Sequence, residues 1–365
     1  MYKKFGIVTF HHALSYGAVL QTYALQNFLT DLGIDNEVVN YRCKFMEDRA
    51  KVFKYIKGKS LKNYCYSFLY GRETVRERKN SDYFGKNFLK MTKPYTKDTL
   101  AQCADDFDGF IAGSDQVWSP ICVGFDSAYF LDFAKKGQKY SYAASFGMKN
   151  LPDEKIDEYQ KRLSDFSAIS VREGSGKELV KNLTDKEAVI NVDPTLLLSS
   201  KKWDKIASSA DINEPYIFLF TVLKPKNLVN YALELARKTG MKVIYLNKAH
   251  KIKDPMLTYM NSVTADKFLG LIKNATYVCT NSFHGNAFSL LYHKNFVVET
   301  DTLIGENNRS KELMTKLGLE NRILAQGLSP EIDAETDWKN VDAFLAEERN
   351  KAKEYLLSIA DVTTV

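Results

Sequence analysis

Short apolar runs alternate with segments of helical periodicity along most of this chain. The runs at 4–10 and 37–41 are rich in β-branched and aromatic residues, which favours strands. Between them, apolar residues recur with helical spacing at 18–32, and Gly33 follows where a helix C-terminus favours glycine. The opening segment therefore predicts a βαβ unit.

The same alternation continues in two series separated by a pause at 196–203. The first series predicts a helix at 153–165 and strands at 107–112, 139–145, 168–171 and 188–192. The second predicts strands at 216–222, 242–246, 277–280 and 295–298, and helices at 227–239, 264–274, after 280, and at 310–317. A charged amphipathic helix is predicted for the tail, at 338–359.

These patterns predict an α/β protein with two Rossmann-like domains facing a cleft. A length of 365 residues with 45% apolar content favours roughly two domains. We place the N-terminal, acceptor-side domain at 1–198 and the C-terminal, donor-side domain at 199–340. A C-terminal helix at 341–365 is expected to pack back on either of them. A deep cleft between tandem domains favours transferases, which join two substrates away from water.

Positive charge is concentrated in one segment. Between Arg42 and Lys97 there are 16 Lys and Arg against 5 Asp and Glu, a balance of +11; the total is +6, so the rest carries 6 − 11 = −5. This basic segment, 42–97, is also rich in Tyr and Phe and is predicted to be mostly helical. Either this segment binds phosphate groups or an anionic membrane, or it is a solvated helical insert. No RNA-binding, zinc-finger or helix-turn-helix pattern accompanies the charge, so nucleic acid is not favoured.

The cysteines and the apolar runs indicate a cytoplasmic protein. The five cysteines are odd in number and scattered without a C-x-x-C pair, which argues against a disulfide framework and a structural zinc site. The apolar run at 5–10 is too short for a signal peptide, and the chain has no apolar span long enough for a membrane helix. Peripheral contact at the inner face of the cell membrane is the further expectation, through the basic segment.

Polar turns follow several predicted strands, where open α/β sheets bind ligands. The chain lacks G-x-G-x-x-G, Walker A, H-E-x-x-H and G-x-S-x-G sequences, which argues against nicotinamide, P-loop, zincin and α/β-hydrolase activities. His284 stands between a predicted strand and a predicted helix. It is either an acid/base residue beside a phosphate-binding helix N-terminus, or a histidine that caps its own helix with Gly285 present for packing.

Four of these turns together resemble the polysaccharide pyruvyl transferase family. They are SYGAVLQTYAL (15–25), GSDQVW (113–118), SVRE with the later DPTLLL (170–173 and 193–198) and TNSFHG (280–285), in the family's order. The resemblance spans roughly residues 5–320. It implies a fold similar to GT-B glycosyltransferases, phosphoenolpyruvate as donor, a hexose of a capsular or exopolysaccharide repeat unit as acceptor, and a pyruvate ketal as product. Phosphoenolpyruvate is then a co-substrate, and the reaction needs neither a metal nor a resident cofactor.

The resemblance implies that His284 is the acid/base residue and that the turn around it binds the donor. The donor residues are then Asn281, Ser282, Phe283 and Gly285. Many family members have an arginine two residues before this histidine, where this chain has Ser282. Arg172 is the first candidate to bind the donor's carboxylate or phosphate, with a salt bridge to Glu173 as the alternative. Arg309 is the second, with an ordinary surface charge as the alternative.

The acceptor is expected to bind to the motifs at 15–25 and 113–118. Asp115 is the candidate base for the acceptor hydroxyls, and helix capping is the alternative for this turn. The residues expected to bind the acceptor are Tyr16, Gly17, Gln21, Ser114 and Gln116. His11 and His12 either bind the acceptor or are exposed in a loop, and Trp118 and Tyr142 either stack on a sugar or belong to the core.

Two other functions remain open from the sequence. One is a glycosyltransferase of the same architecture that uses a nucleotide-sugar donor. The other is a protein without enzymatic activity that binds a glycan or a membrane within a biosynthetic cluster. For the enzyme, a lipid-linked sugar acceptor fits the expected contact of the basic segment with an anionic membrane.

Overall fold

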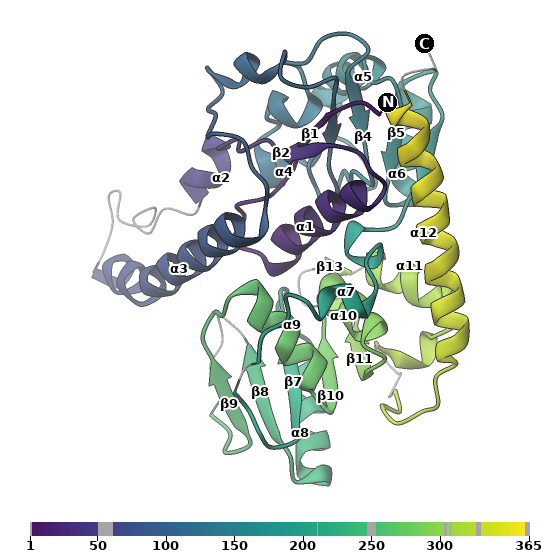
Figure 1. Ribbon diagram of the computed structural model, residues 1–365. Helices are drawn as coiled ribbons and strands as arrows, with labels where there is room; N and C mark the ends of the chain where they lie inside the picture. The colour runs from purple at the N-terminus through teal and green to yellow at the C-terminus, as the bar shows by residue number, and fades with distance from the viewer. Residues whose placement is uncertain are drawn as a thin grey trace. The chain divides into compact units, whose positions relative to one another are not determined.

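The computed structural model describes residues 2–49, 61–209, 211–246, 253–302, 305–306, 308–325 and 330–361. The chain forms two compact units (Figure 1). Unit 1 is Met1–Leu198 together with Glu347–Val365, and unit 2 is Ser199–Ala346. Each unit contains a parallel β-sheet with helices packed on it, so the predicted α/β fold class is confirmed.

Unit 1 contains a four-stranded parallel sheet in the order β2-β1-β3-β4. A parallel pair, β5-β6, joins its edge through bridges from Tyr140 to Ala168 and from Ala144 to Val171. The strands are β1 Phe5–Val8, β2 Asn36–Val38, β3 Gly109–Ala112, β4 Lys139–Ser141, β5 Ile169–Val171 and β6 Ala188–Ile190. The helices are α1 Tyr16–Asp31, α2 Lys44–Arg49, α3 Leu61–Phe88, α4 Pro120–Val123, α5 Ile156–Ser164 and α6 Gly174–Leu183, with short 3-10 turns at Leu100–Cys103, Ser127–Phe130, Asp153–Lys155 and Pro194–Leu196.

Side chains of β1 alternate between two cores, as the pleat of a strand requires. Phe5 and Ile7 pack in one core together with Leu25 of α1 and Leu356 of the C-terminal helix. Val8 belongs to the core on the other face, which contains many aromatic side chains, including Trp118, Phe130 and Tyr159. Trp118 and Tyr142 are both fully buried, so the core alternative is correct for these two residues.

Unit 2 contains a six-stranded sheet in the order β14-β11-β10-β7-β8-β9, and all its pairings are parallel. The strands are β7 Tyr216–Phe220, β8 Lys242–Leu246, β9 Leu257–Met260, β10 Tyr277–Thr280, β11 Asn295–Glu299 and β14 Ile323–Leu324, with an antiparallel pair β12 Asp301–Thr302 and β13 Gly305–Glu306. The helices are α7 Ser200–Trp203, α8 Leu228–Thr239, α9 Ala265–Asn274, α10 Phe283–Leu291 and α11 Asn308–Lys316, with a 3-10 turn at Glu320–Arg322.

The two faces of the unit 2 sheet are covered by different helices. Ile217 and Leu219 of β7 pack in one core with Leu228 and Ala232 of α8. On the other face, the ring centroid of Phe220 lies 4.9 Å from that of Phe268 in α9. The strand is therefore apolar at every position, which is typical of a parallel strand buried on both faces.

The C-terminal helix, α12 Trp338–Ala360, begins in unit 2 and ends in unit 1. Arg349 donates hydrogen bonds to the carbonyl oxygens of Leu196 at 2.9 Å and Leu198 at 3.3 Å. Leu356 and Ile359 are buried in the core of β1. The predicted helix at 341–365 thus belongs to unit 2 up to Ala346 and packs on unit 1 from Glu347 onward, and its residues 362–365 lie outside the described part.

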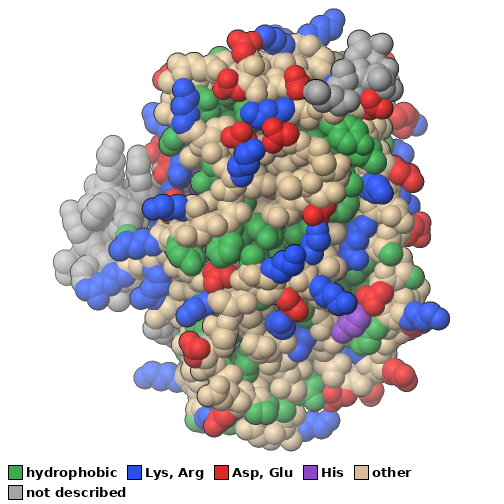
Figure 2. Space-filling model, in the orientation of Figure 1, with side chains coloured by type: hydrophobic (Ala, Val, Ile, Leu, Met, Phe, Trp, Pro, Cys, Tyr) green, Lys and Arg blue, Asp and Glu red, His purple; other side chains and the backbone are tan. Residues whose placement is uncertain are grey.

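The basic segment is mostly helical, as predicted, in the part that the structure describes; its residues 50–60 lie outside that part. Phe84 of α3 is fully buried, and its ring centroid lies 6.0 Å from that of Tyr23 in α1. Lys and Arg side chains gather in Figure 2 at the edge where α3 lies in Figure 1. The segment therefore combines a packed face with a charged one. None of the described helices is both long and apolar enough to cross a membrane.

Candidate functional site

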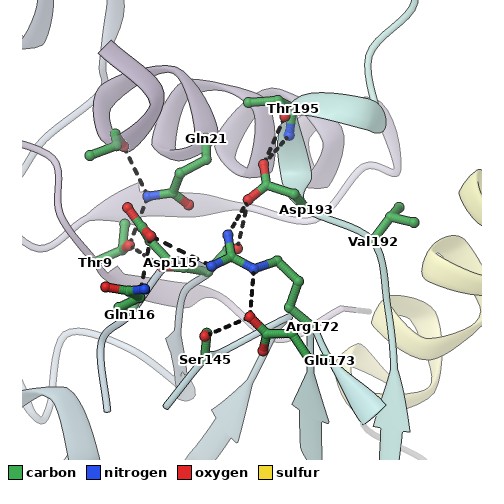
Figure 3. Close-up of polar contacts among 12 residues, drawn as sticks. Thr9, Gln21, Asp115, Gln116, Ser145, Arg172, Glu173, Val192, Asp193 and Thr195 are labelled. Atoms are coloured by element: carbon green, nitrogen blue, oxygen red, sulfur yellow. Dashed lines mark hydrogen bonds and ion pairs between the residues drawn. The ribbon is translucent and has the colours of Figure 1, made fainter. Parts of the chain in front are cut away.

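A buried arginine with three carboxylates lies at the carboxyl ends of the unit 1 strands. Arg172 follows β5 and donates to Asp193 Oδ2 at 2.6 Å, from its Nη1 atom (Figure 3). Its Nε atom lies 3.4 Å from Glu173 Oε1, and its Nη2 atom lies 3.6 Å from Asp115 Oδ1. We call Arg172, Asp115, Glu173 and Asp193 the Arg172 cluster. Parallel strands bring these residues together because their carboxyl ends share one sheet edge.

The charge of Arg172 is balanced within the protein. Its side chain is 4% exposed. Burial opposes the charged form, but the carboxylates of Glu173, Asp193 and Asp115 outweigh it and raise the pKa of Arg172 above its usual value. The salt bridge to Glu173, which the sequence left open, is present. Donor binding by Arg172 stays a prediction, and ion pairing is the role that these contacts support.

Asp115 has an unusual backbone. Its φ angle is 74°, in the left-handed region that non-glycine residues rarely adopt. Its carbonyl oxygen accepts from the Ser145 N–H at 3.0 Å, and its Oδ1 atom accepts from the Gln116 N–H at 3.0 Å. The nearby helix α4 has Ser119 as its N-cap, so the helix-capping alternative for Ser114 and Asp115 is wrong. Strained residues held by their surroundings are frequent at functional sites.

The predicted acceptor residues divide into buried and half-exposed ones. Ser114 is buried and its hydroxyl donates to Asp193 Oδ2 at 3.3 Å. Gln21 is fully buried, and its Nε2 atom donates to Thr9 Oγ1 at 2.9 Å (Figure 3). Gly17 is also buried, whereas Tyr16 and Gln116 are half-buried. The side chain of Asp115 is 15% exposed. Asp115, Tyr16 and Gln116 are therefore the predicted acceptor-side residues most accessible to a ligand.

His11 and His12 are buried, so the exposed-loop alternative for them is wrong. The ring nitrogens of His11 lie 3.2 Å from the Thr9 carbonyl oxygen and 3.1 Å from Asn40 Oδ1. The two imidazole centroids are 4.6 Å apart, and His12 Nε2 lies 3.3 Å from Glu47 Oε1. Burial lowers the pKa of His11 to about 4, and burial together with His11 and two arginines lowers the pKa of His12.

Unit 1 is expected to lose stability below neutral pH because of these histidines. An unfolded histidine has a pKa near 6.5, whereas the pKa of His11 in the folded protein is about 4. Between these values the unfolded state binds more protons, so the free energy of unfolding decreases by up to roughly 3 kcal/mol as pH falls. Thermal unfolding at pH 7 and pH 5 measures this loss, and His11→Asn should flatten the dependence. An unchanged slope in His11→Asn would assign the acid sensitivity to other groups; the exposed His293 provides a control variant.

In unit 2, the turn from β10 into α10 contains most of the predicted donor residues. We call residues 280–286 the α10 turn. Asn281 is fully buried, and its Oδ1 atom accepts from the Val222 N–H at 2.9 Å while its Nδ2 atom donates to the Leu223 carbonyl at 2.9 Å. Ser282 is the N-cap of α10, and its hydroxyl accepts from the Gly285 N–H at 3.3 Å. These two side chains hold the turn and the neighbouring loop in place.

Gly285 is required for close packing. A Cβ atom at this position would lie 2.4 Å from Thr280 Oγ1. The Thr280 hydroxyl is itself fixed, because it donates to the Phe220 carbonyl at 2.8 Å and accepts from the Ser282 N–H at 3.0 Å. The packing role that the sequence left open for this glycine is therefore present.

His284 lies in the first turn of α10, next to Phe283, whose ring contacts a cation from the following helix. Phe283 and His284 are both largely buried, and their ring centroids are 5.3 Å apart. The Arg309 guanidinium of α11 lies 5.7 Å from the centroid of the Phe283 ring. Arg309 is half-buried and makes a cation–π contact with Phe283, and its role in donor binding stays a prediction. It brings a positive charge beside the α10 turn.

In unit 2, the carboxylate of Glu299 binds to the N-terminus of helix α8, a feature that the sequence did not reveal. Glu299, at the end of β11, is almost fully buried. Its Oε1 atom accepts from the N–H groups of Lys226 at 3.1 Å, Asn227 at 2.6 Å and Leu228 at 3.0 Å, at the start of α8. Burial raises the pKa of Glu299. The protein thus fills one helix N-terminus of this sheet with its own anion.

Two solved structures share the fold across nearly the whole chain. A UDP-N-acetylglucosamine 2-epimerase from Rickettsia bellii has 10% identity and a TM-score of 0.50, covering 98% of this chain and 95% of its own. A putative UDP-N-acetylglucosamine 2-epimerase from Listeria monocytogenes has 12% identity and a TM-score of 0.50, covering 96% and 90%. At this identity the likeness shows the fold alone, and it confirms the predicted similarity to the GT-B architecture.

Comparison of the amino-acid sequence identifies a family, whereas the structural likeness identifies only a fold. No curated protein matches the chain significantly. A family model described as polysaccharide pyruvyl transferase matches residues 16–300, a range that contains both the Arg172 cluster and the α10 turn. The match covers most of the chain and agrees with the resemblance carried by the four motifs. The chain belongs to the polysaccharide pyruvyl transferase family.

Proposed function

We propose that this protein transfers the enolpyruvyl group of phosphoenolpyruvate to two hydroxyl groups of a hexose, forming a pyruvate ketal. The hexose belongs to a capsular or exopolysaccharide repeat unit. The observation that carries the proposal is that His284 lies at the N-terminus of α10 and that Arg309 contacts the ring of the adjacent Phe283. It combines a proton carrier, helix N–H groups and a cation.

The donor carries two anionic groups, a carboxylate and a phosphate. A helix N-terminus attracts an anion through its first N–H groups and its dipole, and a guanidinium binds either anion with two parallel hydrogen bonds. Glu299 at α8 supports this assignment, because a carboxylate already binds to a helix N-terminus in the same unit. We assign the donor's anionic groups to the α10 turn and Arg309.

The reaction needs one proton to be added to carbon and two to be removed from hydroxyl groups. His284 delivers a proton to the methylene carbon of the enol, which becomes a methyl group. The first acceptor hydroxyl attacks the adjacent carbon and releases its proton. The bond from that carbon to the phosphate oxygen then breaks, its electron pair leaves with the phosphate, and the second hydroxyl closes the ring and loses its proton.

Acceptor binding is assigned to unit 1. Asp115 is the candidate base for a hydroxyl proton, since its carboxylate is half-buried and adjacent to the half-buried Gln116. Arg172 keeps this carboxylate in position through the contact at 3.6 Å. Tyr16, at the start of α1, is the third residue assigned to the acceptor.

The cellular setting is also part of the proposal. A lipid-linked sugar acceptor would place the reaction at the inner face of the cell membrane, with the protein in the cytoplasm. The basic segment would then contact anionic lipids through its charged face, because clustered Lys and Arg side chains are attracted to anionic headgroups.

Arg309→Gln is expected to weaken phosphoenolpyruvate binding at least about tenfold, because it removes the cation next to the α10 turn. Thermal shift against phosphoenolpyruvate concentration gives the apparent Kd. Lys316→Gln is the matched control, since Lys316 is an exposed cation of the same helix, paired with Glu312. Equal affinity in Arg309→Gln and the wild type would remove Arg309 from the site.

Product analysis tests the function itself. Mass spectrometry of lipid-linked or aryl hexosides incubated with phosphoenolpyruvate should reveal the mass increment of the ketal. If the wild type is stabilised by a nucleotide-sugar and not by phosphoenolpyruvate, the activity is that of a glycosyltransferase. If liposomes bind and no donor turns over, the protein is a membrane-binding partner.

A further inference from the structure

Asn286, in the first half of α10, is a fully buried amide without a hydrogen bond. Its side chain is 0% exposed. Among the residues that the structure describes, neither its Oδ1 nor its Nδ2 atom has a hydrogen-bond partner. Buried amides are nearly always hydrogen-bonded, and leaving both ends unsatisfied reduces stability.

Other buried asparagines of the protein differ from Asn286. The Nδ2 atom of Asn36 donates to the Ile34 carbonyl at 3.0 Å, and that of Asn191 donates to Ser170 Oγ at 2.8 Å. Asn281, five residues before Asn286, both donates and accepts hydrogen bonds. Complete lack of partners is thus not a general property of buried asparagines in this fold.

The position of Asn286 on its helix directs the amide toward the donor-binding turn. Helical side chains lean toward the helix N-terminus, so a residue one turn into α10 covers the first turn, which contains His284. Residues three apart share a helix face, which places Asn286 on the face of Phe283. The Phe283 ring is the one that Arg309 contacts.

We propose that Asn286 is a ligand-binding residue of the α10 turn, whose amide N–H group donates to an anionic oxygen of the donor. The identity of this donor as phosphoenolpyruvate rests on the proposed function. An uncharged amide adds little general attraction for anions, in contrast to Arg309. Its contribution is therefore to selectivity, because only an oxygen at the correct position receives the hydrogen bond.

Asn286→Leu separates this role from a structural one. Leucine has a similar size and removes the unsatisfied amide, so the ligand-free variant should melt about 1–3 °C higher than the wild type. The same variant should bind phosphoenolpyruvate at least about tenfold more weakly. A structural amide would give the opposite pair of results: a lower melting temperature with an unchanged Kd.

Ser289→Ala is the matched control. Ser289 is equally buried on the same helix, and its hydroxyl donates to the Gly285 carbonyl at 2.8 Å. Its variant should retain the Kd of the wild type. If Asn286→Leu does not fold, Asn286→Ala carries the same binding measurement. Inorganic phosphate and pyruvate, used as separate probes, identify which donor oxygen the amide contacts, since only one should lose affinity.

The outcomes distinguish this inference from the proposed function. Wild-type and Asn286→Leu proteins with equal affinity for phosphoenolpyruvate would overturn the inference and leave the function standing. A wild type that binds a nucleotide-sugar and not phosphoenolpyruvate would overturn the function. The affinities of the wild type and Asn286→Leu for the nucleotide-sugar are then compared, and equal values would overturn the inference too. A wild type that binds neither ligand would overturn both.

Discussion

His284→Ala is expected to reduce the rate of ketal formation by about a hundredfold to ten-thousandfold. The proposed reaction needs a proton on the methylene carbon, and His284 is the residue assigned to deliver it. The loss should appear in the initial rate of product formation, followed by mass spectrometry with saturating phosphoenolpyruvate. Binding of the donor should persist, because Arg309 and the N-terminus of α10 remain.

The control for this variant is His293→Ala. His293 is 41% exposed and pairs with Asp342 at 2.9 Å in the same unit. Its removal should leave the rate unchanged. Unfolding curves of both variants show whether the fold is retained. A folded His284→Ala protein with the wild-type rate would refute the assignment of His284 as the proton donor.

Arg172→Met is expected to destabilise unit 1 by about 3–5 kcal/mol, because it leaves buried carboxylates without their cation. The side chains of its partners Asp193 and Glu173 are 0% and 14% exposed, so water cannot fully replace the guanidinium. Urea or thermal unfolding of unit 1 measures the change. Arg172→Lys should recover part of the stability, since it restores the charge without the planar fork.

Arg76→Met is the comparison for this effect. Arg76 is 45% exposed and pairs with Glu73 at 3.0 Å, and such surface pairs contribute about 0–1 kcal/mol. If Arg172→Met keeps the stability of the wild type and loses only phosphoenolpyruvate binding, the original prediction of a donor-binding arginine is correct. The experiment therefore decides between the two roles of Arg172.

The strands could be predicted where burial leaves a continuous apolar run. Tyr216–Phe220 is such a run, because both faces of β7 are covered. Strand β9, LTYM, lies at the sheet edge and is mostly half-exposed, and a run of four residues is too short to distinguish a strand from a loop. Strand β14 is only two residues long, which is too short for any periodicity.

The candidate site could be predicted only where its chemistry is local in sequence. His284 and its helix start are adjacent, so the turn was visible as a motif. The pairing of Arg172 with Asp193 joins residues 21 apart in sequence and depends on β5 and β6 lying side by side. The burial of His11 and His12, and the missing partners of Asn286, depend on tertiary packing, which a single sequence does not specify.

The C-terminal helix has a consequence for how the chain folds. Lys3 Nζ donates to the carbonyl of Ile359, 356 residues away, and Leu356 completes the core around Phe5. Contacts between such distant residues form late, because a very long loop must close first. During synthesis, unit 1 therefore waits for α12, and the part of its sheet face that α1 does not cover stays exposed while unit 2 emerges. Chaperones that shield apolar surfaces would have most to bind during this interval.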